Sequence, residues 1–273
     1  MLASAPPADT IVEGLARRQR RLCVLEAMRD ATHRALLGPV GRHARDALIE
    51  WGFPEPSLPG LDLGYVPDPA FLTRELERSG ALASEAEDAG LIQPTWSGRV
   101  VGPWRNEHGR ILTFFAWRPE RADRLDRYAF AGSGRPPTLF AASPPGRHLF
   151  VVEGLLDALL GSCYGMDGVA GVGGPLSQLS PSQLARLALG GVRELTLLPA
   201  HDEAGRAGVL AVLEHAESPD CSCIEVFVVD PAMMAGARDL AELVRRAGTR
   251  ALTELNSWRM EGEVYRTVLV PWQ

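Results

Sequence analysis

The chain has 273 residues, 28 lysines and arginines against 34 aspartates and glutamates, and a net charge of −6. All 28 of those cations are arginines, which excludes a Walker A lysine and Schiff-base chemistry. No apolar run reaches the length of a membrane span, the N-terminus lacks a secretory pattern, and the four scattered cysteines are typical of a reducing compartment. We therefore expect a cytoplasmic protein without a membrane partner.

The N-terminal part of the chain predicts mostly helices. Residues 1–10, rich in small side chains and proline, are expected to be flexible. Apolar residues at roughly helical spacing predict a long helix over 11–37. Shorter helices are expected over 42–51, capped by Gly52, and around 69–79.

An arginine-rich β-hairpin is expected next. Two short apolar strands, 99–103 and 110–117, flank a turn at 106–109. Residues 99–147 hold nine arginines against four acidic residues, a local surplus of five in an acidic chain. A net acidic protein is a poor non-specific binder of nucleic acid, but such a strip can still follow a phosphate backbone.

Three aromatic residues lie within this arginine-rich strip. Trp104 and Trp117 are expected to pack in the core of a small domain, with stacking on nucleic-acid bases as the alternative. For Tyr128 both interpretations stay open.

The second half of the chain predicts alternating strands and helices. Continuous apolar runs at 149–152, from Glu194, and at 223–229 indicate buried parallel strands. Helices are expected after them, including one over about 203–216 and one that opens at Ala237. A glycine-rich turn after a further strand at 168–170 could let a nucleotide approach the backbone, or it could simply connect strand and helix: Gly171-Val-Gly-Gly174.

A carboxylate follows each of the three apolar strands: Glu153, Asp202 and Asp239. Since the carboxyl ends of parallel strands meet at one sheet edge, these side chains are expected to gather there and to repel unless a cation joins them. Oxygen ligands of this kind suit Mg²⁺ or Mn²⁺. Asp157 lies one helical turn after Glu153 and can share its face. The simpler interpretation is that acids favour helix N-termini because of the helix dipole.

The order and spacing of these motifs resemble a Toprim domain, the fold shared by bacterial primases, topoisomerases and several nucleases. The motifs are Val-Val-Glu-Gly-Leu-Leu-Asp157, His201-Asp-Glu-Ala-Gly-Arg206 and Arg238-Asp-Leu-Ala-Glu-Leu243. The upstream part is similar to DnaG-type bacterial primases, and the resemblance runs from about residue 31 to 247. It rests on Leu63-Gly-Tyr-Val-Pro67, Ala89-Gly-Leu91, Arg99 before a strand that ends in proline, Arg118 closing the next strand, and Arg127-Tyr128.

This resemblance implies a DNA-replication nucleotidyltransferase that makes RNA primers on single-stranded DNA from nucleoside triphosphates. The implied partner is a helicase or another protein subunit, and the implied cofactor is Mg²⁺ or Mn²⁺. The implied catalytic residues are Glu153, Asp202 and Asp239, which with Asp157 would be the metal ligands. The residues implied to bind nucleic acid or nucleotide are Arg99, Arg118, Arg127 and Tyr128.

The sequence departs from the family pattern at two acidic positions. Ala200 stands where the family has the first acid of Asp-x-Asp, and Ala241 stands at a frequent second acid of the last motif. His201, between Ala200 and Asp202, is either a substitute ligand or a solvent-facing side chain. Fewer carboxylates weaken metal binding. A catalytically degenerate subunit that binds nucleic acid or nucleotide within a complex is therefore one alternative function, and a Toprim nuclease is another.

We expect an α/β protein with a Toprim-type parallel sheet flanked by helices, preceded by a smaller mixed α+β lobe, and a substrate groove between the two. It is expected to lack the zinc-binding and helicase-binding modules of replicative primases. The apolar Val268-Leu-Val270 and Trp272 near the end could form a strand or a partner contact. The expected parts are an N-terminal extension over 1–30, the α+β lobe over 31–147, the Toprim domain over 148–247 and a tail over 248–273.

Overall fold

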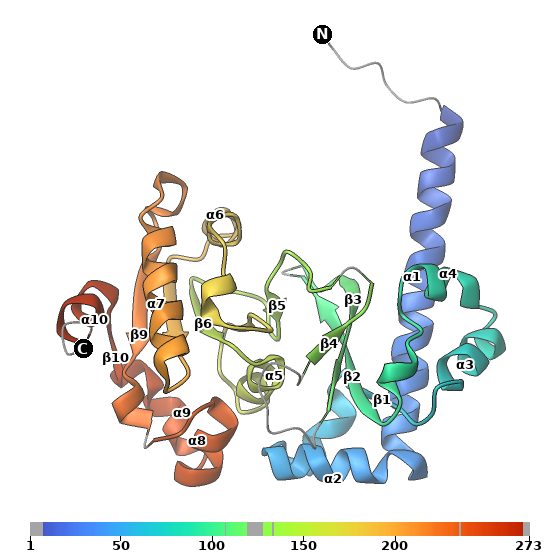
Figure 1. The fold of residues 1–273 in the computed structure, drawn as a ribbon, viewed down its shortest axis with the longest axis horizontal. Helices are drawn as coiled ribbons and strands as arrows, with labels where there is room; N and C mark the ends of the chain where they lie inside the picture. The colour runs from blue at the N-terminus through green and yellow to red at the C-terminus, as the bar shows by residue number, and fades with distance from the viewer. Residues whose placement is uncertain (1–7, 107, 119–127, 133, 235, 270–273) are drawn as a thin grey trace. The chain divides into compact units, whose positions relative to one another are not determined.

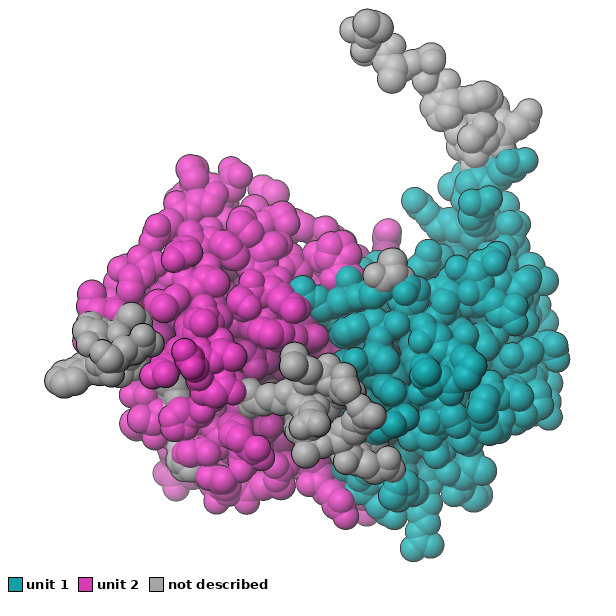
Figure 2. All heavy atoms as spheres, viewed as in Figure 1, with its two compact units in different colours: residues 1–48, 58–104, 111–135 teal, residues 49–57, 105–110, 136–273 magenta. Residues whose placement is uncertain are grey.

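The computed structural model describes residues 8–269 except 107, 119–127, 133 and 235 (Figure 1). The chain divides into two compact units (Figure 2). Unit 1 comprises Met1–Leu48, Leu58–Trp104 and Ile111–Arg135, and unit 2 comprises Ile49–Ser57, Arg105–Arg110 and Pro136–Gln273. The four domain bounds predicted from the sequence stay a prediction.

The predicted N-terminal helices are confirmed. They are α1 (Ala8–Leu37), α2 (Arg42–Trp51) and α3 (Phe71–Ser79). Residues 8–10, which were expected to precede the long helix, belong to α1, and residues 1–7 lie outside the described residues. This part of the chain also contains α4 (Ala83–Asp88) and the 3₁₀ helices η1 (Pro39–Gly41), η2 (Glu55–Gly60) and η3 (Pro94–Trp96).

The apolar face predicted for α1 is buried along its C-terminal half. Leu25, Met28 and Leu36 are at most 2% exposed and belong to the core of unit 1. In contrast, Leu15 is 59% exposed and Leu22 is 39% exposed. Helical spacing identified the helix, but only the part of it that lies against β1 and α3 contributes to the core.

The sheet of unit 1 has the strand order β1-β2-β3-β4. Its strands are β1 (Gly64–Val66), β2 (Arg99–Arg105), β3 (Ile111–Trp117) and β4 (Tyr128–Phe130). The predicted hairpin is confirmed as β2 and β3, and the amide N–H of Gly109 closes the turn on the carbonyl oxygen of Asn106 at 2.9 Å. Trp104 and Trp117 are 0% and 1% exposed, so they pack in the core and the base-stacking alternative is wrong for both.

The sheet of unit 2 has the strand order β10-β9-β8-β6-β7-β5. The four central strands are parallel, as predicted: β6 (His148–Val152), β7 (Val169–Gly171), β8 (Glu194–Leu198) and β9 (Glu225–Val229). Both edge strands are antiparallel, so the sheet is mixed rather than wholly parallel. These edge strands are β5 (Phe140–Ala141) and β10 (Arg259–Glu261).

The segment after residue 247 is more regular than a tail. In addition to β10, it contains α9 (Arg250–Glu254), η8 (Leu255–Ser257) and α10 (Gly262–Leu269). The strand suggested for Val268 is wrong, because Val268 lies in α10, whose Tyr265 is 1% exposed and belongs to the core of unit 2. Val270 and Trp272 lie outside the described residues.

Helices α6 (Pro181–Leu189), α7 (Glu203–Ala216) and α10 contribute to one core cluster with alternate residues of the sheet of unit 2. Leu149 and Val151 of β6 share this cluster with Leu184 of α6 and Val209 of α7, as the two-residue period of a strand requires. The other described helices of unit 2 are α5 (Leu155–Cys163), α8 (Leu240–Ala247), η5 (Leu176–Gln178), η6 (Pro219–Cys221) and η7 (Pro231–Met234).

No helix within the described residues combines the length and apolar character needed to cross a membrane. All four cysteines are free thiols. Burial raises the pKa of Cys163 and of Cys221, which keeps both thiols in their unreactive protonated form.

Candidate functional site

Glu153 is held at the turn between β6 and α5. Its carbonyl oxygen accepts hydrogen bonds from the amide N–H groups of Gly173 and Gly174, at 2.9 and 3.3 Å. Its side-chain Oε1 accepts from the amide of Leu176 at 3.4 Å. Two amides of the glycine-rich turn 171–174 therefore bind the backbone of Glu153. This contact agrees with the interpretation that the turn connects strand and helix, rather than with a nucleotide approaching its backbone.

Asp202 caps the N-terminus of α7. Its Oδ1 accepts the amide N–H of Gly205 at 2.8 Å, which satisfies one of the free donors at the helix start. Asp202 and His201 are both exposed, as expected for His201 in the solvent-facing interpretation. A Cβ on Gly205 would lie 2.1 Å from the carbonyl oxygen of Ala200, so glycine is needed where α7 passes close to the end of β8.

Asp239 caps α8 in the same way, because its Oδ1 accepts the amide N–H of Glu242 at 2.8 Å. The helix therefore starts at Leu240, three residues after the predicted start at Ala237. Glu242 in turn holds the preceding turn: its Oε2 accepts the amide of Arg238 at 2.9 Å and the Nε of Arg238 at 3.1 Å. Arg246 donates to its Oε1 at 2.6 Å.

These contacts lower the pKa of the Glu242 carboxyl group. The backbone N–H of Arg238, followed by the guanidinium groups of Arg238 and Arg246, lowers the pKa of Glu242 from 4.5 to about 2. A lowered carboxyl pKa contributes stability above pH 4.5, and this contribution is lost as the pH falls toward 2.

We expect the unfolding free energy of Glu242→Gln to fall less steeply than that of the wild type as the pH drops from 4.5 toward 2. Urea unfolding at a series of pH values measures this dependence. The matched control is Glu214→Gln, on the exposed surface of α7, whose unfolding free energy should depend on pH as in the wild type. The same pH dependence in all three proteins would contradict a stabilising role of ionised Glu242.

Asp157 occupies a buried position in the first turn of α5. It is 5% exposed, and its Oδ1 accepts the amide N–H of Ala241 in α8 at 3.1 Å. A Cβ on Gly154 would lie 2.1 Å from its Oδ2, so the carboxylate lies directly over the Cα of that glycine. The assignment of Asp157 as a metal ligand stays a prediction, but its carboxylate already binds the backbone at the start of α8.

The strand register brings two of the predicted acids to neighbouring strand ends. Val152 of β6 pairs with Leu198 of β8, so Glu153 and the segment leading to Asp202 leave the sheet at the same edge. Asp239 follows the next strand, β9, after η7. Within the part of the chain that the structure describes, no three His, Cys, Asp or Glu side chains lie close enough together to hold a metal ion.

The donor type at this edge of the sheet, the carboxylate oxygen, is the type that Mg²⁺ and Mn²⁺ take. Mg²⁺ is commonly bound by one or two carboxylates together with substrate phosphates, rather than by a closed protein cage. Glu153 and Asp202 supply carboxylates whose Oε1 and Oδ1 are oriented by backbone amides. Both positions where the resemblance expects a further acid are buried alanines, since Ala200 is 3% exposed and Ala241 is 0% exposed.

The predicted nucleic-acid residues meet at one end of the unit 1 sheet. Arg99 begins β2, Arg118 directly follows β3, and Tyr128 begins β4. Because β2 and β3 form a hairpin and β4 is antiparallel to β3, these positions share the sheet end opposite the turn at 106–109. All three are partly buried, and the ring of Tyr128 meets Phe115 edge-on at 6.0 Å. Arg127 lies outside the described residues.

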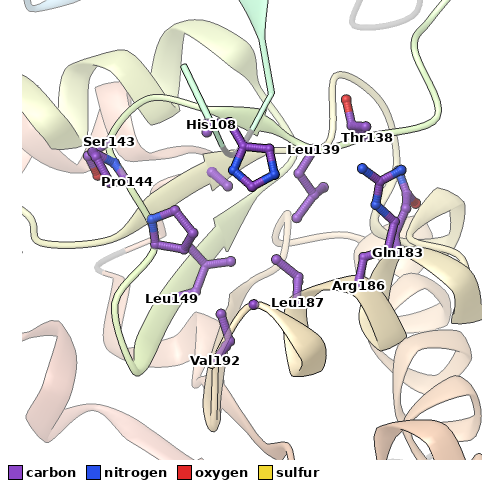
Figure 3. Close-up of a pocket in the computed structure, with 14 residues that line it drawn as sticks. His108, Thr138, Leu139, Ser143, Pro144, Leu149, Gln183, Arg186, Leu187 and Val192 are labelled. Carbon is purple, nitrogen blue, oxygen red and sulfur yellow. The ribbon is translucent and has the colours of Figure 1, made fainter. Parts of the chain in front are cut away.

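Sequence reasoning missed two polar residues of α6, Gln183 and Arg186, which line a cavity in unit 2 (Figure 3). A signal for the helix was present, because Ser180-Pro-Ser-Gln183 combines a capping box with proline at the first helical position.

No family model matches the chain, and no curated protein matches it significantly in sequence. Solved structures do match. A DnaG primase catalytic domain bound to single-stranded DNA is 19% identical with a TM-score of 0.72, over 94% of this chain and 84% of that one. The RNA polymerase domain of Mycobacterium tuberculosis primase DnaG is 23% identical with a TM-score of 0.73, over 93% and 88% of the two chains. The E. coli primase catalytic core is 18% identical with a TM-score of 0.69, over 91% and 83%.

The chain has the fold of a DnaG-type primase catalytic core. The predicted α/β class and the predicted resemblance are thereby confirmed. A match over 94% of the chain necessarily takes in both units.

Proposed function

We propose that this chain is a primase-like nucleotidyltransferase that synthesises RNA primers on single-stranded DNA from nucleoside triphosphates. The observation that carries the proposal is the primase-core fold over both units, together with Glu153 and Asp202 following adjacent parallel strands. Among the solved structures of similar fold is a primase domain bound to single-stranded DNA.

In this proposal, each group has a positioning or charge-neutralising role. Phosphoryl transfer depends on alignment and charge neutralisation more than on covalent chemistry. Glu153, Asp202 and Asp239 would hold Mg²⁺ or Mn²⁺, which supplies charge neutralisation for the triphosphate and helps activate the 3′-hydroxyl. The backbone amides that bind Glu153 and Asp202 fix these carboxylates in place before substrate arrives.

Unit 1 would supply the phosphate contacts. Arg99, Arg118 and Arg127 are proposed to bind the template backbone or the triphosphate as paired N–H donors. Tyr128 would stack on a base through the part of its ring that stays accessible. The groove between the lobes and a helicase or other protein partner stay predictions.

Primer synthesis tests the proposal directly. Purified protein is incubated with mixed-sequence single-stranded DNA, labelled nucleoside triphosphates and either Mg²⁺ or Mn²⁺. We expect short RNA products from the wild type and a loss of about 100-fold or more in Glu153→Gln, the size of effect seen when one transition-state charge stabiliser is removed. Glu214→Gln makes the same charge change on the exposed surface of α7 and should leave synthesis unchanged.

A second candidate is a catalytically degenerate subunit that binds nucleic acid or nucleotide. The buried alanines Ala200 and Ala241 favour it, because two expected carboxylates are missing. No RNA product with either metal, combined with retained DNA binding, would support this candidate and contradict the first. Metal binding that appears only in Ala200→Asp would support it further, whereas degradation of the template by the wild type would indicate a nuclease.

DNA binding tests the arginine assignments separately from catalysis. We expect Arg99→Ala and Arg118→Ala each to weaken single-stranded DNA binding and to reduce the salt slope by about 1, as for the loss of one phosphate contact. Fluorescence anisotropy at several salt concentrations measures both quantities. Arg78→Ala, an exposed arginine of α3, is the matched control. An unchanged affinity and salt slope in both variants would overturn the assignment.

A further inference from the structure

Unit 2 contains a cavity of about 210 Å³ that the proposed primase activity does not use (Figure 3). It lies against α6, with walls from β5, β6 and β7 and from the segment that connects β5 to β6. Its walls are mainly apolar and include Leu139, Pro144, Leu149, Leu187 and Val192.

This cavity lies toward the end of the sheet opposite the acidic residues. Leu149 is the second residue of β6, whereas Glu153 follows the last one, and a strand rises about 3.3 Å per residue. Val192 likewise precedes β8, whereas Asp202 comes after it. Because β6 and β8 are parallel, the cavity lies toward their amino ends and is separate from the proposed metal edge.

Gln183 brings a buried hydrogen-bond donor to this cavity. It is 6% exposed, and its Oε1 accepts the amide N–H of Ser180 at 2.8 Å in the capping box of α6. That contact identifies the oxygen of the amide group, so the other atom is the Nε2 donor. Within the described residues, Nε2 donates no hydrogen bond, so this donor is left to bind a ligand in the cavity.

The charge of the lining favours an anion. Arg186 lies one helical turn after Gln183 on the same face of α6, and both side chains line the cavity (Figure 3). No Asp or Glu belongs to the described lining, which also includes His108 and the Thr138 hydroxyl. The described lining therefore carries no negative side chain beside Arg186.

The volume and the apolar walls of the cavity indicate the size and the apolar character of the ligand. A dry apolar cavity of about 150 Å³ binds benzene, so a volume of about 210 Å³ has room for a ring or a branched chain plus one small polar group. Pockets of this kind use apolar walls for affinity and a few polar groups for orientation.

We propose that this cavity binds a small monocarboxylate with an aromatic or branched apolar body. Leu149, Leu187 and Val192 contact the apolar body, and the Nε2 of Gln183 and the guanidinium of Arg186 bind the carboxylate. The site is independent of the proposed primase activity, and its test needs no catalysis.

Calorimetric and ligand-observed NMR titrations with benzoate, phenylacetate and isovalerate test the site, with benzyl alcohol as the neutral probe. We expect at least one carboxylate to bind saturably with a Kd at or below about 1 mM and to bind more tightly than benzyl alcohol. Gln183→Glu keeps the capping acceptor but replaces the donor by a negative charge, so it should weaken binding about tenfold or more. Arg186→Gln should weaken it similarly.

Gln178→Glu is the matched control, because it makes the same change on an exposed glutamine of unit 2 outside the cavity and should leave carboxylate binding unchanged. Thermal unfolding of each variant verifies that the fold is retained. The absence of saturable binding by all three carboxylates would overturn the proposal. Equal binding of benzyl alcohol, or unchanged affinity in both Gln183→Glu and Arg186→Gln, would overturn it as well.

Discussion

Replacing Gly205 by alanine is expected to lower the unfolding free energy by about 1–3 kcal/mol, the usual cost of overpacking a closely packed site. A Cβ at this position would lie 2.1 Å from the carbonyl oxygen of Ala200 and 2.9 Å from its carbonyl carbon and its amide nitrogen. These are backbone atoms, which cannot move aside as the end of a flexible side chain can. Relief of the clash requires the first turn of α7 to move away from the end of β8.

The sign of this change is set by two opposing effects. Alanine favours a helix over glycine by up to about 1 kcal/mol, which alone would stabilise α7. The clash outweighs this gain because Gly205 is buried and its amide N–H also donates to Asp202 at 2.8 Å. A shift of Gly205 therefore disturbs the cap and the orientation of the Asp202 carboxylate.

Gly14→Ala in α1 separates the two effects. No atom lies within 4 Å of a Cβ built on Gly14, so only the helix preference acts there and stability should rise slightly. Urea unfolding followed by circular dichroism compares both variants with the wild type. A Gly205→Ala protein as stable as Gly14→Ala would show that α7 can shift at no cost.

The same glycine illustrates what could be predicted from the sequence. The stretch Asp202-Glu-Ala-Gly-Arg206 indicated a helix entry after a strand, and the structure has both. Apolar runs likewise predicted β6, β8 and β9 because a strand buried on both faces leaves a continuous apolar run in the sequence. The two antiparallel edge strands were not predicted. β5 and β10 are only 2 and 3 residues long, too short for a period to be visible.

The places of the candidate site residues could be predicted from the sequence, but their contacts could not. Strand ends indicated where Glu153, Asp202 and Asp239 would lie along the sheet. What each carboxylate contacts depends on backbone groups distant in sequence: the amide of Leu176 for Glu153, and that of Ala241 for Asp157. Such long-range contacts have no local sequence signal. The cavity beside Gln183 depends on the packing of α6 against three strands and is equally invisible in the sequence.

Asp157→Ala is expected to lower the unfolding free energy by about 1–3 kcal/mol, the cost of leaving a buried donor without its acceptor. The donor is the amide N–H of Ala241, bound by Oδ1 of Asp157 at 3.1 Å, so the carboxylate joins α5 to the start of α8. At 5% exposure, water cannot readily replace it. Asp157→Asn keeps an oxygen acceptor of the same size and should retain most of this stability.

Metal binding then decides between a structural Asp157 and a ligand. Mn²⁺ is titrated by calorimetry, with a nucleoside triphosphate present, into the wild type, Asp157→Asn and Glu153→Gln. If Asp157 acts through the amide of Ala241, Asp157→Asn should bind Mn²⁺ like the wild type, whereas Glu153→Gln should bind it more weakly. If Asp157→Asn instead loses Mn²⁺ binding as Glu153→Gln does while it keeps its stability, Asp157 is a ligand. The amide of Ala241 would then serve to orient that ligand, as hydrogen bonds to ligating carboxylates do at metal sites.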